Sequence, residues 1–159
     1  MLTLNQVIKN LNNIADSHQQ LNHFFYGEVY DFASSGTVDY PALVVSQEPS
    51  VLSDKVLTMS FNLYVADLVH KDISDRQEVL SDTQSILIDV VALLKRTTGY
   101  DWAVNLNNIT INDFVDKWDE EVSGWWLKLN LRIPNPLDRC AVPVSGVPAI
   151  ENPADSGGG

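Results

Sequence analysis

An alternation in residues 122–133 constrains the fold more strongly than any other feature of the chain. From Trp125 onward, every second side chain is large and apolar, as far as Ile133. The apolar set is Trp125, Leu127, Leu129, Leu131 and Ile133, and the intervening set is Trp126, Lys128, Asn130 and Arg132. Successive side chains of a strand point to opposite faces, so this period predicts a strand with one face in a core. Such a strand requires partner strands.

Three further segments contain strand-forming residues. Residues 24–30 are rich in aromatic and β-branched side chains and predict a first strand. Residues 42–46 predict a second strand, and the alternation of residues 56–66 predicts a long third strand. Because Pro49 lies in the intervening residues 47–55, we expect these to form a connection, with the second and third strands paired as a hairpin.

Apolar residues at helical spacing predict two helices. The first covers residues 4–17 and opens with Thr3 and Gln6, which match a capping box. The second covers residues 75–96, with another candidate capping motif at Ser74. Its core stripe consists of Val79, Leu80, Thr83, Ile86, Leu87, Val90, Val91 and Leu94. Both helices are amphipathic, and we expect them to cover one face of the sheet.

The second helix has more apolar surface than one core stripe requires. At about 100° per residue, Ile88 lies roughly 130° from the centre of the stripe and Leu93 roughly 90° from it. Large exposed apolar patches usually mark a contact surface. We therefore interpret Ile88 and Leu93 as candidates for contact with a neighbouring subunit.

Taken in chain order, these elements predict an α+β fold, with an antiparallel or mixed sheet of about four to six strands covered by two helices. Residues 1–133 would form this single domain. Residues 134–159 contain prolines at positions 134, 136, 143, 148 and 153 and close on Ser156 and three glycines. This composition opposes regular structure, so we expect an extended C-terminal arm.

No motif for enzyme chemistry occurs in the sequence, and we expect the chain not to be an enzyme. Nucleophile elbows, phosphate-binding loops and His-Glu-x-x-His helices are all absent from it. His18, His23 and His70 lack partners at zinc-ligand spacing, and a polar role at the end of the first helix suits His18 and His23. We expect no catalytic residue and no cofactor.

An acidic segment at residues 113–121 overlaps the end of a strand expected at residues 109–115. Its carboxylates, the only cluster that could attract a metal, are Asp113, Asp116, Asp119, Glu120 and Glu121. Apolar and basic side chains interrupt the alternate oxygen ligands that calcium loops require. We interpret the segment as the turn of a solvated or interface-facing hairpin and expect no metal.

The charge, the hydropathy and the cysteine content of the chain each limit what it can be. The chain has ten Lys and Arg against 21 Asp and Glu, a formal net charge of −11. Such acidity repels phosphate backbones, which argues against specific nucleic-acid binding. It suits a wall that DNA slides past, although a charge of this size more commonly serves to keep a protein in solution. The sequence contains no run of about 18 apolar residues, so it predicts no membrane span, and no signal peptide is evident. Cys140 is the single cysteine, and we expect it to be a small buried residue.

The order of the elements supports a family resemblance. Tyr40-Pro41 opens a strand, the long strand at residues 56–66 leads into the capped helix at residues 75–96, and Gly124-Trp125 opens a final strand. Over about residues 2–133, this order resembles the tail-terminator and head-to-tail joining proteins of tailed bacteriophages. The proline-rich continuation is similar to that of the neck-ring proteins of crAss-like gut phages.

The resemblance implies a structural virion protein that forms a homo-oligomeric ring of six- or twelve-fold symmetry in the neck or tail. The ring would join the portal to the tail, contact neighbouring portal, neck and tail proteins, and let DNA pass through its lumen. It would be assembled in the host cytoplasm and reside in the virion. The residues also leave open a small non-viral α+β binding or regulatory module, acting as a monomer or dimer.

Candidate interface residues follow from the ring interpretation. Trp126 shares the outer strand face with Lys128 and Arg132, and aromatic and Arg side chains are enriched at interface anchors. Packing within the sheet would explain Trp126 equally well. The expected contact residues are Ile88, Leu93, Trp126, Lys128, Arg132, Pro134, Leu137 and Arg139.

Overall fold

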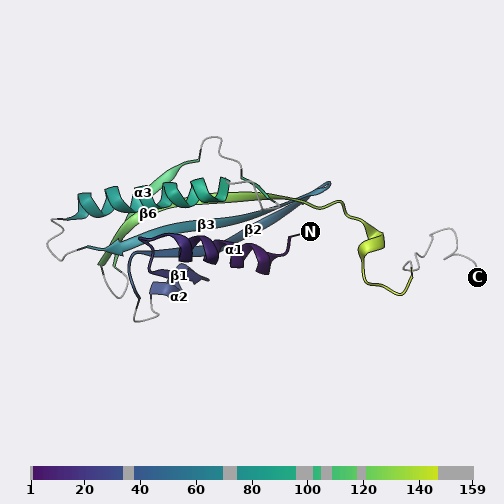
Figure 1. Cartoon of the computed structure of the whole chain (residues 1–159), viewed down its shortest axis with the longest axis horizontal. Helices are drawn as coiled ribbons and strands as arrows, with labels where there is room; N and C mark the ends of the chain where they lie inside the picture. Colours follow the sequence, from purple (N-terminus) through teal and green to yellow (C-terminus); the bar gives the residue numbers. More distant parts are fainter. Residues whose placement is uncertain are drawn as a thin grey trace, which may run out of the picture.

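The computed structural model describes residues 2–33, 38–69, 75–95, 102–104, 109–117 and 121–146 (Figure 1). Its helices are α1 (Leu4–Ser17), α2 (Val29–Ala33) and α3 (Arg76–Lys95), followed in the arm by the 3-10 turn η1 (Arg139–Ala141). Its strands are β1 (His23–Tyr26), β2 (Ala42–Ser53), β3 (Val56–Leu68), β4 (Ala103–Val104), β5 (Ile111–Lys117) and β6 (Glu121–Pro134). The predicted α+β class is confirmed.

The strands form one mixed sheet of six strands in the order β1-β2-β3-β6-β4, with β5 also paired to β6. β1 runs parallel to β2, and the other described pairs are antiparallel. β3 pairs with β6 along its whole length, from Val56 opposite Pro134 to Leu68 opposite Val122. The alternating segment at residues 122–133 therefore lies inside the sheet, between β3 on one side and β4 and β5 on the other.

The main core lies between the sheet and the two long helices, α1 and α3, which cover the same face (Figure 1). The fully buried side chains of the alternating segment include Leu127, Leu129, Leu131 and Ile133. Trp125 shares their face but is only partly buried, and its indole N–H donates to the carbonyl oxygen of Leu80 in α3 at 2.7 Å. The inward face predicted from the alternation is confirmed.

Both long helices match their predicted limits closely. α1 opens with the predicted capping box: the Gln6 N–H donates to Thr3 Oγ1 at 3.3 Å, and the Thr3 N–H donates to Gln6 Oε1 at 2.8 Å. The capping motif expected at Ser74 lies outside the described residues. The fully or nearly buried residues of α3 are Val79, Thr83, Ile86, Leu87, Val90 and Leu94.

The first strand is shorter than predicted, because Gly27 interrupts it. Gly27 adopts φ +153°, a conformation that residues with a Cβ rarely take. The chain then turns into α2, so the strand predicted over residues 24–30 is wrong in its second half. Phe32 of α2 is buried against Ala42 and Val44, on the sheet face opposite α1 and α3. A short third helix therefore covers one end of that face.

The second strand is longer than predicted, because a register shift accommodates its proline. β2 continues through most of residues 47–55, which were wrongly expected to form a connection. Its pairing with β3 shifts between Glu48 and Val51, on either side of Pro49. A bulge at this point removes the need for the N–H that proline lacks. β2 and β3 form one long hairpin, near whose tip Val51 and Leu52 are exposed.

The acidic segment at residues 113–121 is strand over much of its length, so its assignment as a turn is wrong there, whereas the predicted hairpin is confirmed by the antiparallel pairing of β5 with β6. β5 includes the first half of the segment, and Glu121 opens β6. Residues 118–120, between the two strands, lie outside the described part of the chain. Asp113 is exposed and pairs through its backbone with Trp125. Its charge stays in water, and therefore does not oppose strand formation.

Candidate interaction surface

The side of the sheet opposite α1 and α3, which we call the outer face, is only partly covered. α2 packs over one end of it, where the ring of Phe32 lies 5.3 Å from that of Phe25 and 6.3 Å from that of Tyr40, measured between centroids. Among the described elements, no other helix lies on this side (Figure 1). Much of the outer face of β3 and β6 is therefore available for contact.

An aromatic cluster follows α2 on the outer face. Tyr64 of β3 stacks on Trp126 of β6 with centroids 5.9 Å apart, and meets Phe114 of β5 edge to face at 6.0 Å. Aromatic pairs contribute about 0.5–1.5 kcal/mol beyond the area that they bury. Packing within the sheet therefore accounts for Trp126 without a second subunit, and its role between subunits stays a prediction.

Beyond the aromatic cluster the outer face becomes polar. Ser60 donates to Asn130 Oδ1 at 2.6 Å, and the side-chain amide of Asn62 donates to Glu48 Oε1 at 2.5 Å. Burial raises the pKa of Tyr64, and the Glu48 carboxylate adds to that rise. Hydrogen bonds thus link polar side chains across β2, β3 and β6.

Lys128 and Arg132, which we call the cation pair, are exposed on the outer face of β6. Across the strand pair, Lys128 lies opposite Asn62 and Arg132 lies opposite Thr58, so neither faces a carboxylate directly. With the described residues, neither cation forms an ion pair. A chain of net charge −11 therefore presents two cations on this face without using them to neutralise its own described carboxylates.

The two apolar contact candidates on α3, Ile88 and Leu93, differ in their exposure to solvent. Ile88 is 50% exposed, whereas Leu93 is partly buried and packs against the core of its own subunit. Leu93 therefore has a cover within its own chain. The excess apolar surface expected on this helix is concentrated at Ile88.

Carboxylates follow one side of α3. Glu78, Asp82 and Asp89 are all exposed, and Asp89 Oδ2 lies 2.9 Å from His18 Nε2 just past the end of α1. The helix-end role predicted for His18 is confirmed. The ring of His23 instead lies in β1, with its centroid 6.1 Å from that of Phe32. The two histidines thus face different partners.

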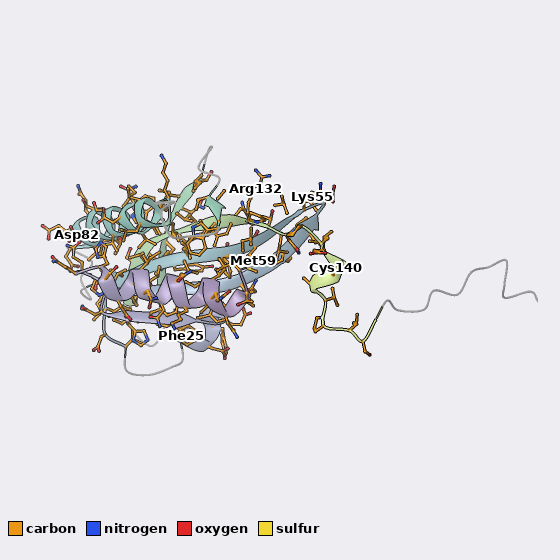
Figure 2. The ribbon with its side chains drawn as sticks, turned by 45° about the vertical axis from the view of Figure 1, so that its right-hand side comes forward. Phe25, Lys55, Met59, Asp82, Arg132 and Cys140 are labelled. Carbon is orange, nitrogen blue, oxygen red and sulfur yellow. The ribbon has the colours of Figure 1, made fainter. Side chains whose placement is uncertain are left out.

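The arm leaves the domain beside the β2–β3 hairpin, where Lys55 and Cys140 mark the same end of the molecule (Figure 2). Pro134 is the last residue of β6, and the next N–H, of Asn135, donates to the Lys55 carbonyl at 2.8 Å. Leu137 is 54% exposed. The side chain of Arg139 lies outside the described part of the chain.

Two apolar arm residues were missed by the sequence reasoning, and one residue was placed wrongly. Val142 and Val144 are 51% and 50% exposed, a pattern that their position on either side of Pro143 could have indicated. Cys140 is exposed, so the prediction of a buried cysteine is wrong. The chain has already left the core at Pro134, and no described element covers η1.

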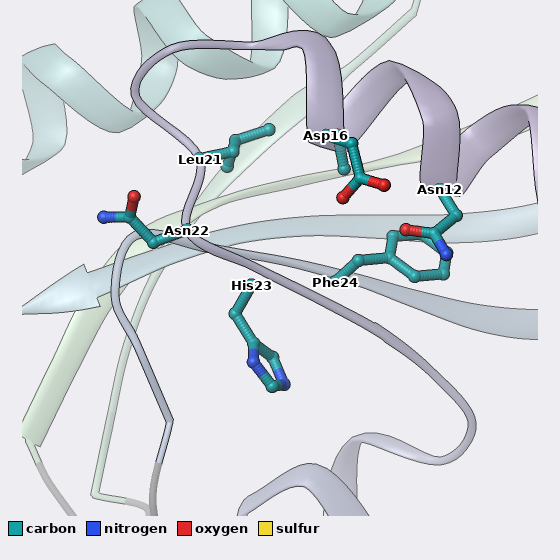
Figure 3. A pocket seen from close by; sticks show the side chains of 7 residues that line it. Asn12, Asp16, Leu21, Asn22, His23 and Phe24 are labelled. Carbon is teal, nitrogen blue, oxygen red and sulfur yellow. The ribbon is translucent and has the colours of Figure 1, made fainter.

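A polar hollow of about 350 Å³ lies between α1 and β1 (Figure 3). Its lining residues are Asn12, Ala15, Asp16, Leu21, Asn22, His23 and Phe24. The side chain of Asn22 donates to the Tyr40 carbonyl at 2.8 Å, which fixes the chain between α1 and β1. Among the described residues, no group of three or more His, Cys, Asp or Glu is arranged to hold a metal.

No protein-family model matches the chain, and no curated protein matches it. In the described part of the chain, none of the helices combines the length and the apolar character that crossing a membrane requires. The molecule is an α+β domain with one sheet face under helices, a second face that bears the cation pair, and an arm with exposed apolar residues.

Proposed function

We propose that the chain is a structural protein of a phage virion and forms a homo-oligomeric ring in the neck or tail. The observation that supports this most directly is the arm. Leu137, Val142 and Val144 are each about half exposed on a segment that extends away from the domain (Figure 2). Burial of apolar surface stabilises a contact by about 25 cal/mol per Å². Contact with a neighbouring subunit would bury these side chains. A closed ring offers such a neighbour to every copy.

The sheet edges, which no further described strand pairs, offer a second means of association. β1 lies at one end of the sheet and β4 and β5 at the other, so backbone groups of these end strands face away from the sheet. Such edges pair readily with a strand from another chain. An arm that reached a neighbouring subunit would combine this pairing with burial of its apolar side chains.

The acidity of the chain suits the passage of DNA. In this proposal the ring joins the portal to the tail, contacts neighbouring portal, neck and tail proteins, and encloses a lumen through which DNA moves. A net charge of −11 per subunit would repel the phosphate backbone and limit adhesion. The role is structural, without catalysis, and its location is the virion neck or tail.

Electron microscopy of the purified chain tests the proposal, first alone and then with portal and tail proteins of the same virus. We expect ring-shaped particles with a central hole and six- or twelve-fold symmetry, which stack on those partners. A chain that remains monomeric at micromolar concentration, with and without the partners, would overturn the proposal.

The hollow beneath α1 favours the alternative of a small binding or regulatory module. Asn12, Asp16, Asn22 and His23 could offer hydrogen bonds to a small polar ligand there. A module of this kind would act as a monomer or dimer. Particle mass therefore separates it from the ring.

A further inference from the structure

We propose that neighbouring subunits pack head to tail, with the outer face of one copy seated on α3 of the next. This inference rests on the proposed ring and assigns its contact surfaces. On one copy the contact is the cation pair, Lys128 and Arg132. On the next copy it is Asp82 and Asp89 of α3, which we call the carboxylate pair.

The charges on the two surfaces are complementary. The cation pair has no ion-pair partner among the described residues of its own subunit. Asp82 and Asp89 are exposed, and the Asp89 side chain remains 56% exposed although His18 contacts one of its oxygens. A second copy can therefore supply carboxylates to cations that its neighbour leaves unmatched. Complementary charges of this kind fix which surfaces meet.

The spacing of the charges also matches. Asp82 and Asp89 are seven residues apart on one side of α3, which separates their Cα atoms by about 10.5 Å along the helix axis. Lys128 and Arg132 are four residues apart on one face of β6, a separation of about 13 Å. The difference of about 3 Å is within the reach of flexible Lys and Arg side chains.

The side chains between the charges permit close approach. Ser85 lies midway between the two carboxylates and Asn130 midway between the two cations, and neither is large. Ile88 is 50% exposed beside Asp89, and Trp126 lies beyond Lys128 on the outer face. These two residues would form the apolar part of the contact. A helix laid on a sheet is also the arrangement that covers the inner face of each subunit.

A second copy suits the cation pair better than DNA does. Glu48 lies on the same face of the sheet, and the chain as a whole carries a net charge of −11. Both oppose a phosphate backbone. Because the two protein surfaces differ, each copy uses its outer face toward one neighbour and α3 toward the other. Such a heterologous contact closes into a ring when its rotation permits.

Charge reversal tests the assignment. The variant Lys128→Glu/Arg132→Glu changes the net charge from −11 to −15, since each substitution removes one positive and adds one negative charge. We expect it to sediment as monomer under conditions in which the wild type forms rings. Adding Asp82→Lys and Asp89→Lys should restore the rings, because it returns both the charge pairing and the net charge of −11.

A mismatched quadruple variant controls for total charge. It combines Lys128→Glu/Arg132→Glu with Asp39→Lys and Asp54→Lys, two exposed positions that do not belong to α3. Restoration of rings by the matched variant alone supports the assignment. If the matched and mismatched variants sediment alike, whether both form rings or both stay monomeric, the assignment is overturned. Wild type that forms no rings refutes the proposed function itself, so the two failures are distinguishable.

Cross-linking keeps the assignment testable if a charge variant fails to fold. Ser85→Cys and Asn130→Cys are introduced together into a Cys140→Ser background, which removes the native thiol. The two positions lie on opposite sides of the sheet, so a disulfide between them must join two copies. Oxidation should give a ladder of covalent oligomers. Absence of that ladder from assembled rings contradicts the assignment. If Lys128→Glu/Arg132→Glu keeps its rings but loses an affinity for DNA that the wild type shows, the cation pair binds DNA, which contradicts the assignment as well.

Discussion

At the scale of single residues, Gly124 determines how closely β6 approaches β3. A Cβ added there would lie 1.8 Å from the Val65 carbonyl oxygen and 3.2 Å from the Cα of Ala66. Because the obstructing atoms belong to the backbone, Gly124→Ala should push the strands apart. We expect it to lower the free energy of unfolding by about 3 kcal/mol, measured by chemical denaturation.

The matched control for this glycine is Gly146→Ala in the arm. A Cβ added at Gly146 meets nothing within 4 Å. The φ of +103° at Gly146 disfavours alanine, but the arm lies outside the core, so a local change of backbone there disturbs no core contact. Its denaturation midpoint should therefore equal that of the wild type. A Gly124→Ala variant as stable as Gly146→Ala would show that the strands separate without cost.

Asp67, at the end of β3, is a carboxylate placed where ionisation is unfavourable. Burial raises the pKa of Asp67 above its ordinary value of 3.8, and the nearby Asp82 and Asp75 carboxylates add to the rise. A hydrogen bond from the Leu68 N–H to Asp67 Oδ1 at 2.8 Å opposes it. The folded chain thus binds this proton more readily than the unfolded chain does, so stability is lost as pH rises through the folded pKa.

The variant Asp67→Asn tests this effect of pH. It cannot ionise, yet its side-chain oxygen can still accept from the Leu68 N–H. We expect a higher Tm than wild type at neutral pH, and a difference that disappears below pH 3.8. Thermal unfolding measured from neutral pH to below pH 3.8 gives this difference in Tm, and the exposed Asp39→Asn variant is the control. A constant difference at all pH values would point to packing instead of charge.

Some residue roles could be predicted from the sequence and others could not. Alternation alone placed Leu127 to Ile133 of β6 correctly, because strand geometry forces every second side chain to one face. It could not show that Trp126 stacks on Tyr64, since that contact depends on the register between two strands. Nor could it show that Cys140 is exposed, since the exposure depends on where the arm leaves the body.

At the scale of elements, α1 depends on its capping box. Thr3 Oγ1 satisfies the N–H of Gln6, one of the four donors that a helix leaves without partners at its N-terminus. Thr3→Ala should therefore cost about 1 kcal/mol of stability. Urea denaturation measures the loss, and Thr3→Ser, which keeps the hydroxyl, should retain most of the wild-type stability. Equal losses in both variants would mean that the methyl group matters more than the cap.

Long periodic elements were predictable, and their interruptions were not. The helical stripe of α3 and the alternation of β3 each repeat over enough residues to override local exceptions. In isolation, Gly27 and Pro49 both indicate turns, yet their outcomes differ. Gly27 ends β1, whereas a bulge lets β2 continue past Pro49. Their effects depend on whether neighbouring strands accept the distortion. The cation pair was found from the sequence, whereas the carboxylate pair of α3 required the helix in place.

At the scale of the whole molecule, the arm lies outside the core of the domain. The variant that ends after Pro134 retains every described core residue. Of the hydrogen bonds between arm and hairpin that involve described residues, it loses the one from the Asn135 N–H to the Lys55 carbonyl. We expect a Tm within about 4 °C of the full-length chain, corresponding to at most about 1 kcal/mol. Ring formation should weaken, as the apolar arm residues are gone. Unfolding of the truncated chain would instead make the arm part of the core.

The mass of the native particle, measured by light scattering at micromolar concentration, tests ring formation directly. One subunit has a mass of 17.7 kDa. The ring account predicts a single species of about six or about twelve subunits that does not grow further, because a closed ring leaves no subunit unpartnered. A stable species of one or two subunits, unchanged on adding portal and tail proteins, would contradict it.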